Sequence, residues 1–297
     1  MHTFSPDRLL QAGFGFRSAK ALLAAVEIGL FTELGRGPRS SFQLCRALAL
    51  DARAAPDLLD ALVAMGVLDR EGDDERAVYL NTREAGHFLD RRSPAYIGAV
   101  LESANARSYG NWAELSAALR GAQAIPGVAA HAAPDAESSA IPVTALDAFV
   151  ARFDFSAHRS LACIGADADE LARRLAAHHP QLTCQCVDLH EPWPPGDVIV
   201  LIGLLHACNA DTRLEWIRRS HAALAGGGCL VAIGPLIDGA RRHNLFALLA
   251  SLDARLGTGS ACGFSAADFD AWCRDAGFAR SEVMALGETA IAAIAHK

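Results

Sequence analysis

The chain lacks the features that mark membrane, secreted or nucleic-acid-binding proteins. Its apolar stretches are interrupted well short of the roughly 20 residues that a membrane-spanning helix needs. Its first residues carry neither the basic nor the apolar region of a signal peptide. The 297-residue chain has a net charge of −7, which argues against a nucleic-acid partner. We therefore expect a cytoplasmic protein that binds neither a membrane nor nucleic acid.

Sequence signatures of metal sites and of common nucleophiles are also missing. None of the eight cysteines forms a Cys-x-x-Cys pair, and several lie in apolar runs, so we expect reduced thiols with a structural role. His178 and His179 are adjacent on a predicted helix and cannot put both rings on one face. Cys184 and Cys186 share a strand face, but no partner motif accompanies them. There is no P-loop and no Gly-x-Ser-x-Gly elbow, and we predict no metal.

Apolar residues, by contrast, are plentiful, at 52% of the chain, which is enough for a sizeable core and suggests about two domains. Residues 1–120 read as a mostly helical domain. Helices are expected over Ser18–Leu34, from Ser40 or Ser41 to Leu50, and over Asp51–Met65, followed by a hairpin at 66–80. Three helices and a hairpin are typical of a winged helix. Residues 1–95 hold 12 Lys and Arg against 13 Asp and Glu, so we expect dimerisation rather than DNA binding.

The pattern changes in the second half of the chain. Residues 121–145 are rich in Ala, Pro, Gly and Ser, which predicts a linker or a lid. Residues 146–297 alternate apolar strands with helices, which favours a Rossmann-like α/β domain with a largely parallel sheet covered on both faces. Strands are expected at 161–165, 182–188, 197–204, 229–233, 281–286 and 290–295, and helices at 169–178, 213–224, 244–256 and 266–276.

One segment of this α/β domain, residues 160–171, has the strand–turn–helix pattern at which nucleotide-binding folds hold a cofactor. Such a turn favours glycines, because only a bare backbone can approach a ligand closely. Here Gly165 is followed by Ala166 and Asp167, with Asp169 in the first turn of the predicted helix. The site is recognisable but altered.

The order and spacing of many short segments together resemble the bacterial small-molecule O-methyltransferases, which join a winged-helix dimerisation domain to a class I S-adenosylmethionine (SAM) fold. In the first half the resemblance rests on Gly13-Phe-Gly-Phe-Arg-Ser-Ala-Lys-Ala-Leu, Ala25-Val-Glu-Ile-Gly-Leu-Phe, Leu59-Asp-Ala-Leu-Val-Ala-Met-Gly-Val-Leu and Tyr79-Leu-Asn-Thr. In the second half it rests on Phe153-Asp-Phe-Ser, Pro192-Trp-Pro-Pro-Gly-Asp-Val, Leu204-Leu-His and Leu224-Ala-Gly-Gly-Gly-Cys-Leu.

This resemblance implies methyl transfer from SAM to a substrate oxygen by a homodimer. His206 matches the family's catalytic histidine, which takes the hydroxyl proton. Gly165 matches the first glycine of the cofactor loop, and Asp188 matches the acid that contacts the ribose. Four residues are expected at the substrate pocket, although core packing or an ordinary surface position is an open alternative for them: Tyr109, Trp112, His243 and Phe246.

The chain also departs from the family pattern around the cofactor. Asp167 and Glu170 have the spacing of a capping box, which predicts that the turn caps its own helix. Only Leu189–Gly196 separates Asp188 from the next strand, too short for a crossover helix. A helix and a strand of the family are therefore expected to be missing, with Asp188 left at a sheet edge.

Orienting groups around the histidine also differ from the family. His206 is followed by Ala207-Cys208 where the family often has Asp-Trp, Ile202 stands at a common lysine position, and Gly234 stands at an expected acidic position.

Three hypotheses about function follow from these matches and departures. The favoured one is an enzyme of natural-product biosynthesis that no longer methylates with SAM in the ordinary way and uses His206 for proton transfer in a rearrangement, cyclisation or elimination. The second is an active SAM-dependent O-methyltransferase acting on a phenolic or otherwise hydroxylated small molecule. The third is a non-catalytic dimer partner of a related enzyme. The expected cofactor differs accordingly. The first hypothesis implies no cofactor or weakly bound SAM, and the alternative is SAM as the cofactor.

Overall fold

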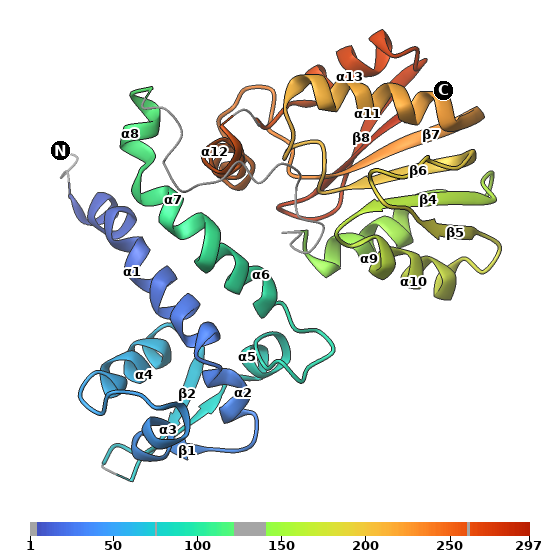
Figure 1. The fold of residues 1–297 in the computed structure, drawn as a ribbon. Helices are drawn as coiled ribbons and strands as arrows, with labels where there is room; N and C mark the ends of the chain where they lie inside the picture. Colours follow the sequence, from blue (N-terminus) through green and yellow to red (C-terminus); the bar gives the residue numbers. More distant parts are fainter. Residues whose placement is uncertain (1–4, 75, 122–140, 260–261) are drawn as a thin grey trace. The chain divides into compact units, whose positions relative to one another are not determined.

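The computed structural model describes residues 5–74, 76–121, 141–259 and 262–297, and the chain divides into two compact units, Met1–Gly110 and Asn111–Lys297 (Figure 1). The boundary expected from the sequence, at residue 120, falls inside the second unit. Most of the predicted linker at 121–145 lies outside the described residues. Among the described helices, none combines the length and the apolar character that crossing a bilayer requires.

The first unit confirms the winged-helix prediction. Its three-stranded antiparallel sheet has the order β1-β3-β2, with Arg70 of β2 opposite Tyr79 of β3. Two of the three helices expected before the hairpin lie close to their predicted bounds. The helix expected over Ser18–Leu34 instead begins at Asp7 and is interrupted at Gly29, whose φ is +77°. The elements are α1 (Asp7–Glu27), α2 (Leu30–Leu34), β1 (Arg39–Ser40), α3 (Ser41–Leu48), α4 (Ala55–Ala64), β2 (Leu68–Glu71), β3 (Val78–Asn81), α5 (Arg83–Phe88), α6 (Gly98–Ser103), a π-helical turn (Ala104–Ser108) and the start of α7 (Tyr109–Ala113).

Local sequence explains where these helices begin. Ser40 caps α3 in a capping box, since its hydroxyl accepts from the Gln43 N–H while the Gln43 side chain accepts from the Ser40 N–H. Pro56 occupies the first turn of α4, where a missing N–H costs nothing. The helices and the hairpin enclose one apolar core, formed by Ala25, Val26, Leu30, Phe31, Leu34, Leu44, Leu59, Leu62, Leu68, Tyr79, Ala85 and Leu89.

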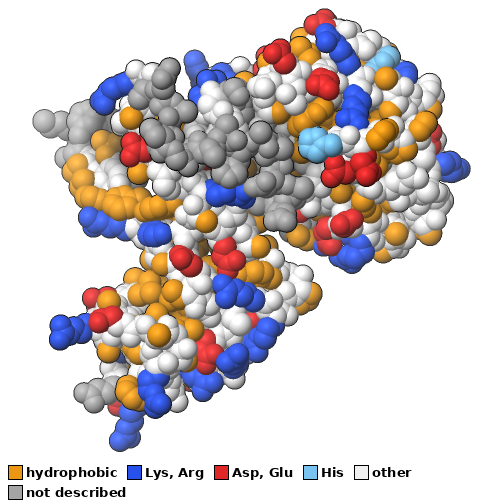
Figure 2. Space-filling model, in the orientation of Figure 1, with side chains coloured by type: hydrophobic (Ala, Val, Ile, Leu, Met, Phe, Trp, Pro, Cys, Tyr) orange, Lys and Arg blue, Asp and Glu red, His pale blue; other side chains and the backbone are white. Residues whose placement is uncertain are grey.

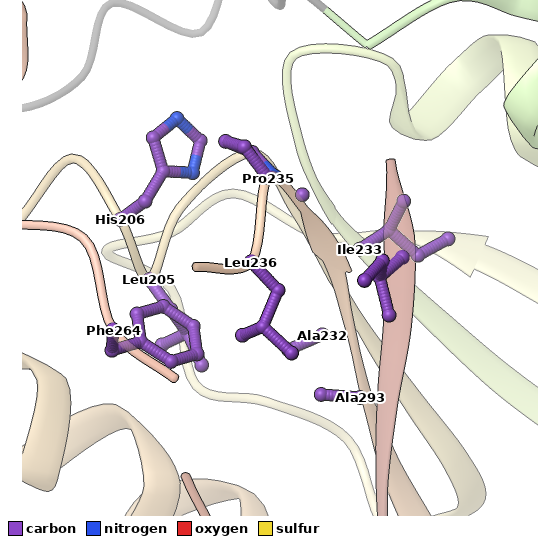
Figure 3. Close-up of a pocket in the computed structure, with 10 residues that line it drawn as sticks. Leu205, His206, Ala232, Ile233, Pro235, Leu236, Phe264 and Ala293 are labelled. Atoms are coloured by element: carbon purple, nitrogen blue, oxygen red, sulfur yellow. The ribbon is translucent and has the colours of Figure 1, made fainter. Parts of the chain in front are cut away.

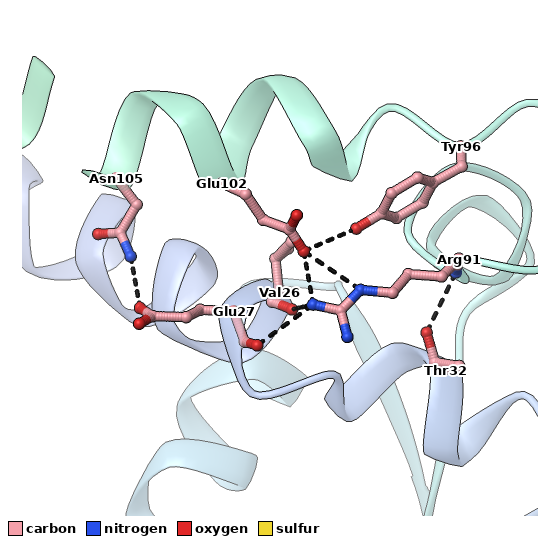
Figure 4. Close-up of polar contacts among 7 residues, drawn as sticks. All are labelled: Val26, Glu27, Thr32, Arg91, Tyr96, Glu102 and Asn105. Carbon is pink, nitrogen blue, oxygen red and sulfur yellow. Dashed lines mark hydrogen bonds and ion pairs between the residues drawn. The ribbon is translucent and has the colours of Figure 1, made fainter. Parts of the chain in front are cut away.

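An arginine ties the later helices of this unit back to α1 (Figure 4). The Arg91 guanidinium donates to the carbonyls of Val26 and Glu27 at the C-terminal end of α1, and it forms an ion pair with Glu102 of α6. Tyr96 donates to the same Glu102 carboxylate. A cation at the C-terminal end of a helix is also stabilised by the helix dipole. Arg91 therefore joins α1 and α6 with favourable electrostatics.

The first half of α1 carries apolar side chains that this unit does not cover (Figure 2). Leu9, Leu10, Phe14 and Phe16 are all exposed, Leu9 by 77% of its surface. A run of exposed large apolar side chains on one helix marks an interaction surface rather than random exposure.

The second unit is built on a six-stranded sheet of order β5-β4-β6-β7-β9-β8. The first four strands are parallel, and β9 pairs antiparallel with both β7 and β8, which confirms the predicted parallel sheet with an antiparallel edge. The strands are β4 (Ser160–Gly165), β5 (Thr183–Cys186), β6 (Gly196–Ile202), β7 (Leu224–Gly234), β8 (Arg280–Ala285) and β9 (Ile291–His296). The helices are α8 (Leu115–Leu119), α9 (Val143–Arg152), α10 (Ala168–His178), α11 (Ala210–Ala223), α12 (Leu245–Thr258) and α13 (Ala266–Asp275).

Helices cover both faces of this sheet, as Figure 1 shows. Alternate residues of β6 point to opposite faces, so Val198 and Val200 pack with α9 and α10, whereas Ile199 and Leu201 pack with α11 and α13. Burial on both faces explains why the central strands read as continuous apolar runs.

Helix α9 corrects the expectation that residues up to 145 form a linker, because Val143–Ala145 open this helix. Ala145, Leu146, Phe149 and Val150 are buried, and this spacing on a helix forms one apolar face. Phe149 also packs edge-on against Phe155, with ring centroids 5.6 Å apart. The spacing of these apolar residues could therefore have predicted α9, but the Ala-rich and Pro-rich residues before it obscured where the helix begins.

Candidate functional site

The strongest sequence candidate, His206, lies in the loop between β6 and α11. This loop follows the carboxyl end of a central parallel strand, which is where open α/β sheets place ligands. Gly203 turns the chain at a φ of +70° and donates its N–H to the Ile233 carbonyl of β7 at 2.9 Å. Asn209 caps α11 by accepting from the Thr212 N–H. The loop is therefore anchored at both ends.

His206 lines a small recess in the second unit (Figure 3). His206 and Pro235 lie at one end of the recess, and Leu236, Phe264 and Ala293 lie toward the other. The recess is narrow and partly open to solvent. The walls are apolar apart from the imidazole and backbone groups, so a substrate group that enters would meet His206 as the titratable side chain.

The surroundings of His206 favour its neutral form. Removal of the half-buried ring from water, together with the positive charge of Arg213, lowers the pKa of His206 to about 4. The imidazole is therefore unprotonated at neutral pH and has a free lone pair. It can accept a proton, although a base with a lowered pKa needs an acidic donor, such as a phenol, to do so efficiently.

The expected acidic partner of the histidine is absent at Gly234. A Cβ placed on Gly234 would lie 3.2 Å from Nδ1 of His206, so a side chain at 234 points at the imidazole. We predict that Gly234→Asp raises the pKa of His206 by about 1–2 units, because a carboxylate within a few ångströms stabilises the imidazolium. Titration of the ¹³C-labelled histidine by NMR measures the effect. The neutral variant Gly234→Asn has the same shape, and an equal shift in both variants would contradict the electrostatic reason.

Gly165 is the last residue of β4 and has a φ of +126°, and the packing around it explains why a glycine is needed. A Cβ at this position would lie 2.2 Å from the carbonyl oxygen of Ile202 on β6. Glycine is therefore required here by the neighbouring strand, whether or not a cofactor binds. A glycine at this position is, for that reason, weak evidence for SAM.

Asp188 lies just beyond β5, and β5 is the outermost strand of the sheet on that side in the described residues. This arrangement agrees with the strand and helix expected to be missing. The exposed Asp188 carboxylate accepts from the backbone N–H of His190 at 2.8 Å. Arg219 of α11 donates to the carbonyls of Leu189 and Glu191 and so ties the short connection to this helix.

The predicted capping box at the start of α10 is wrong. Asp167 occupies the N-cap position, but its side chain does not accept from the first turn of the helix. Glu170 does not reach back either, because its carboxylate pairs with Arg173 and Arg174 one turn along. Arginines three and four residues away on the same helix compete successfully for this carboxylate. The acidic residues Asp169 and Glu170 nevertheless occupy the first turn, where an anionic ligand would otherwise bind.

The four expected pocket residues do not line the recess beside His206. Half-buried Tyr109 belongs to the first unit, where the Lys20 ammonium lies 4.7 Å from its ring centre. Trp112 belongs to the second unit and donates its indole N–H to Asp253 of α12 at 2.7 Å. His243 and Phe246 are exposed at the start of α12.

The loop that carries His243 is organised by an aspartate that the sequence did not single out. The Asp238 carboxylate accepts from the backbone N–H groups of Arg242, His243 and Asn244. These hydrogen bonds lower the pKa of Asp238 to about 2. Asn244 then caps α12 by accepting from the Ala247 N–H. The sequence signal that could have identified Asp238 is an aspartate, followed by an asparagine, in the turn before an apolar helix.

Comparison with known proteins decides the family. Residues 10–91 match the O-methyltransferase dimerisation domain. Over the full length, the chain is 31% identical to the tetracenomycin polyketide synthesis 8-O-methyl transferase TcmO of Streptomyces glaucescens, covering 100% of this chain and 98% of TcmO. The chain belongs to the O-methyltransferase family with an N-terminal dimerisation domain.

Two further comparisons agree with this assignment. The N,N-dimethyltransferase OxyT of Streptomyces rimosus is 29% identical over 91% of this chain and 90% of its own length. Human N-acetylserotonin methyltransferase, solved in complex with SAM, shares the fold with a TM-score of 0.83 at 20% identity, over 99% of this chain and 98% of the human chain. The alignment with TcmO runs over 337 positions, more than the 297 residues of this chain, so TcmO has residues without a counterpart in this chain.

Proposed function

We propose that this chain is a homodimeric enzyme of natural-product biosynthesis in which His206 removes a proton from a hydroxylated small molecule and in which ordinary SAM-dependent methylation has been lost. The proton transfer would serve a rearrangement, cyclisation or elimination. The observation that carries this proposal is the neutral imidazole of His206 at the carboxyl end of β6, beside an apolar recess.

The residues at the cofactor position fit SAM poorly. Asp169 places a carboxylate in the first turn of α10, where the resemblance puts the carboxylate end of SAM, while the Glu170 carboxylate beside it is paired with Arg173 and Arg174. In the part of the chain that the structure describes, no further strand lies beside β5, so Asp188 there lacks the neighbouring segment that would contact adenine. Gly165 is explained by the Ile202 carbonyl alone. We therefore assign no step of the reaction to this cofactor.

Methyl transfer remains the second candidate, favoured by one specific observation. The identity of 31% to a polyketide 8-O-methyl transferase extends over the whole chain. Transfer to a phenolic oxygen would use the same base, since a phenol must lose its proton before or as it attacks a methyl group. The two candidates differ in the cofactor site rather than at His206.

We predict that calorimetric titration of the purified, ligand-free dimer with S-adenosylhomocysteine gives no binding at micromolar concentrations, because of the acidic first turn and the exposed edge at Asp188. TcmO, titrated in parallel, serves as a positive control for the handling of the ligand. Mass spectrometry first excludes co-purified cofactor. Micromolar binding at one site per chain would contradict the proposal and make methyl transfer the leading function.

The proposed homodimer is supported by the family model over residues 10–91 and by the exposed apolar side chains of α1, among them Leu9, Phe14 and Phe16. Burial of such side chains between two copies would release water from apolar surface, which favours association.

A further inference from the structure

Arg213 on α11 is a buried cation in an unusual environment. Its side chain is 1% exposed, yet within the described ranges no carboxylate pairs with it. Burial of an unpaired charge is costly unless hydrogen bonds replace the lost water. A side chain of this kind therefore needs a strong set of acceptors, and the structure shows where they come from.

The acceptors are backbone carbonyls of the loop that carries His206. Nε of Arg213 donates to the Leu205 carbonyl at 2.7 Å, and Nη2 donates to the Cys208 carbonyl at 3.2 Å. These two carbonyls bracket His206. Nη2 also donates to the carbonyl of Cys262 at 2.6 Å, which ties the loop to the segment before α13. Hydrogen bonds from an ionised donor are stronger than those between neutral groups.

Two aromatic rings complete the environment of the guanidinium. Its central carbon lies 5.1 Å from the ring centre of Phe264 and 4.7 Å from that of Trp272. Both distances are within the range of cation–π attraction, which strengthens where water is excluded. Phe264 also lines the recess beside His206, so the same group holds the loop and one wall of the recess.

We propose that Arg213 is the positioning residue of this site: it clamps the Leu205–Cys208 loop and thereby fixes the place of His206 at the recess. The loop needs such a clamp because Ala207 and Cys208 stand where the resemblance leads one to expect Asp-Trp, and neither side chain can orient the imidazole by charge. The proposal rests on the function proposed above for His206, but the clamp can be tested without a substrate.

The charge of Arg213 has a second effect on the same histidine, because it lowers the pKa of His206 in addition to the effect of burial. The other titratable groups that interact with Arg213 are Cys208 and Cys262, which are free thiols, and Asp268 at the start of α13. Of these, Asp268 is the carboxylate, and hydrogen bonds from Ser265 hold its pKa below the ordinary value. The positive charge of Arg213 is thus a major local electrostatic influence on the imidazole.

The test compares Arg213→Met, Arg213→Lys and a matched control in the full-length dimer. Methionine keeps an apolar side chain of similar length but removes the donors and the charge. Lysine keeps the charge but cannot bond the flanking carbonyls as a planar fork. The control is Arg219→Met, because Arg219 lies on the same helix, bonds two carbonyls of another loop and lies over Trp193 at 4.3 Å.

Two readouts are used, hydrogen exchange of residues 205–208 by mass spectrometry and NMR titration of His206, assigned with a His206→Gln variant. We expect Arg213→Met to speed exchange in the loop at least tenfold and to raise the pKa of His206 toward its ordinary value, because one of the two causes that lower this pKa is removed. Arg213→Lys is expected to speed exchange while leaving the pKa low. Arg219→Met should change neither. If Arg213→Met does not fold, the lysine variant alone decides whether the loop is clamped.

Unchanged exchange of the loop in folded Arg213→Met, or in Arg213→Lys if only that variant folds, would overturn the proposal. The failure of the proposed function looks different. If His206→Gln keeps full turnover, His206 is not the base, yet faster loop exchange in the Arg213 variants would still establish the clamp. If His206 is the base, Arg213→Lys should lower kcat more than it changes KM, since positioning of a base acts on the reacting state.

Discussion

His206→Gln is expected to lower turnover about 10²–10⁴-fold, the range in which a well-placed general acid or base contributes. Glutamine retains the approximate size and polarity of the imidazole but cannot accept a proton near neutral pH. Because the recess is otherwise lined by apolar side chains, no neighbouring residue there is available to replace the base. The assay uses the substrate found by screening hydroxylated aromatic compounds for any change of mass or absorbance.

The pH dependence of turnover provides an independent check on the same residue. The pKa of His206 is lowered to about 4, and the base must be unprotonated to act. Turnover in the wild type should therefore stay nearly constant from neutral pH down to about pH 5 and fall only below it, whereas an ordinary histidine would lose activity below about pH 6.5. A matched control is His243→Gln, which removes an exposed imidazole and should keep near-normal turnover. Full activity of His206→Gln would show that the base lies elsewhere.

Gly165→Ala is expected to destabilise the second unit by about 3–5 kcal/mol, since it combines backbone strain with overpacking. The φ of +126° is one that alanine adopts only under strain, and the new Cβ would lie 2.2 Å from the Ile202 carbonyl oxygen. This oxygen belongs to the central strand β6 and cannot move without disturbing the sheet. Denaturant unfolding monitored by circular dichroism measures the loss.

The control for this substitution is Gly239→Ala, in the same unit. A Cβ at Gly239 would meet nothing within 4 Å, so little change in stability is expected. The measurement also separates two reasons for a glycine at 165. If Gly165→Ala were as stable as the wild type, the packing reason would be wrong, and closeness to a ligand would become the better explanation of this glycine.

Much of the fold could be predicted from the sequence because the signals are local. The period of apolar residues placed α3, α4, α10–α13 and the central strands β4 and β6 within a few residues of their observed bounds, and a serine at 40 or 41 predicted the start of α3. The helix predicted to start at Ser18, however, begins at Asp7. The short connection after Asp188 predicted that β5 would be left at an edge, because a crossover helix needs more residues than the chain provides. The choice of His206 as the candidate base followed from the family resemblance and from its position after a predicted strand.

The sequence alone did not decide which side chains and backbone groups contact one another in the folded chain. The capping box at Asp167 and Glu170 has the right spacing, but Arg173 and Arg174 take the carboxylate of Glu170 instead. The sequence pattern indicates that Gly165 is a cofactor-binding glycine, whereas the structure shows that the nearby Ile202 carbonyl already leaves no room for a side chain there.

The environment of His206 shows this division most clearly. The sequence by itself determined the two-domain organisation, the sheet and the position of His206 after β6, because these follow from periodicity, chain length and local order. Only the tertiary structure brought Arg213, which lies seven residues further along on α11, into contact with the carbonyls of the loop and with two aromatic rings. Periodicity and motif spacing do not reveal such a contact, because it depends on how helix α11, the loop and the segment before α13 pack together.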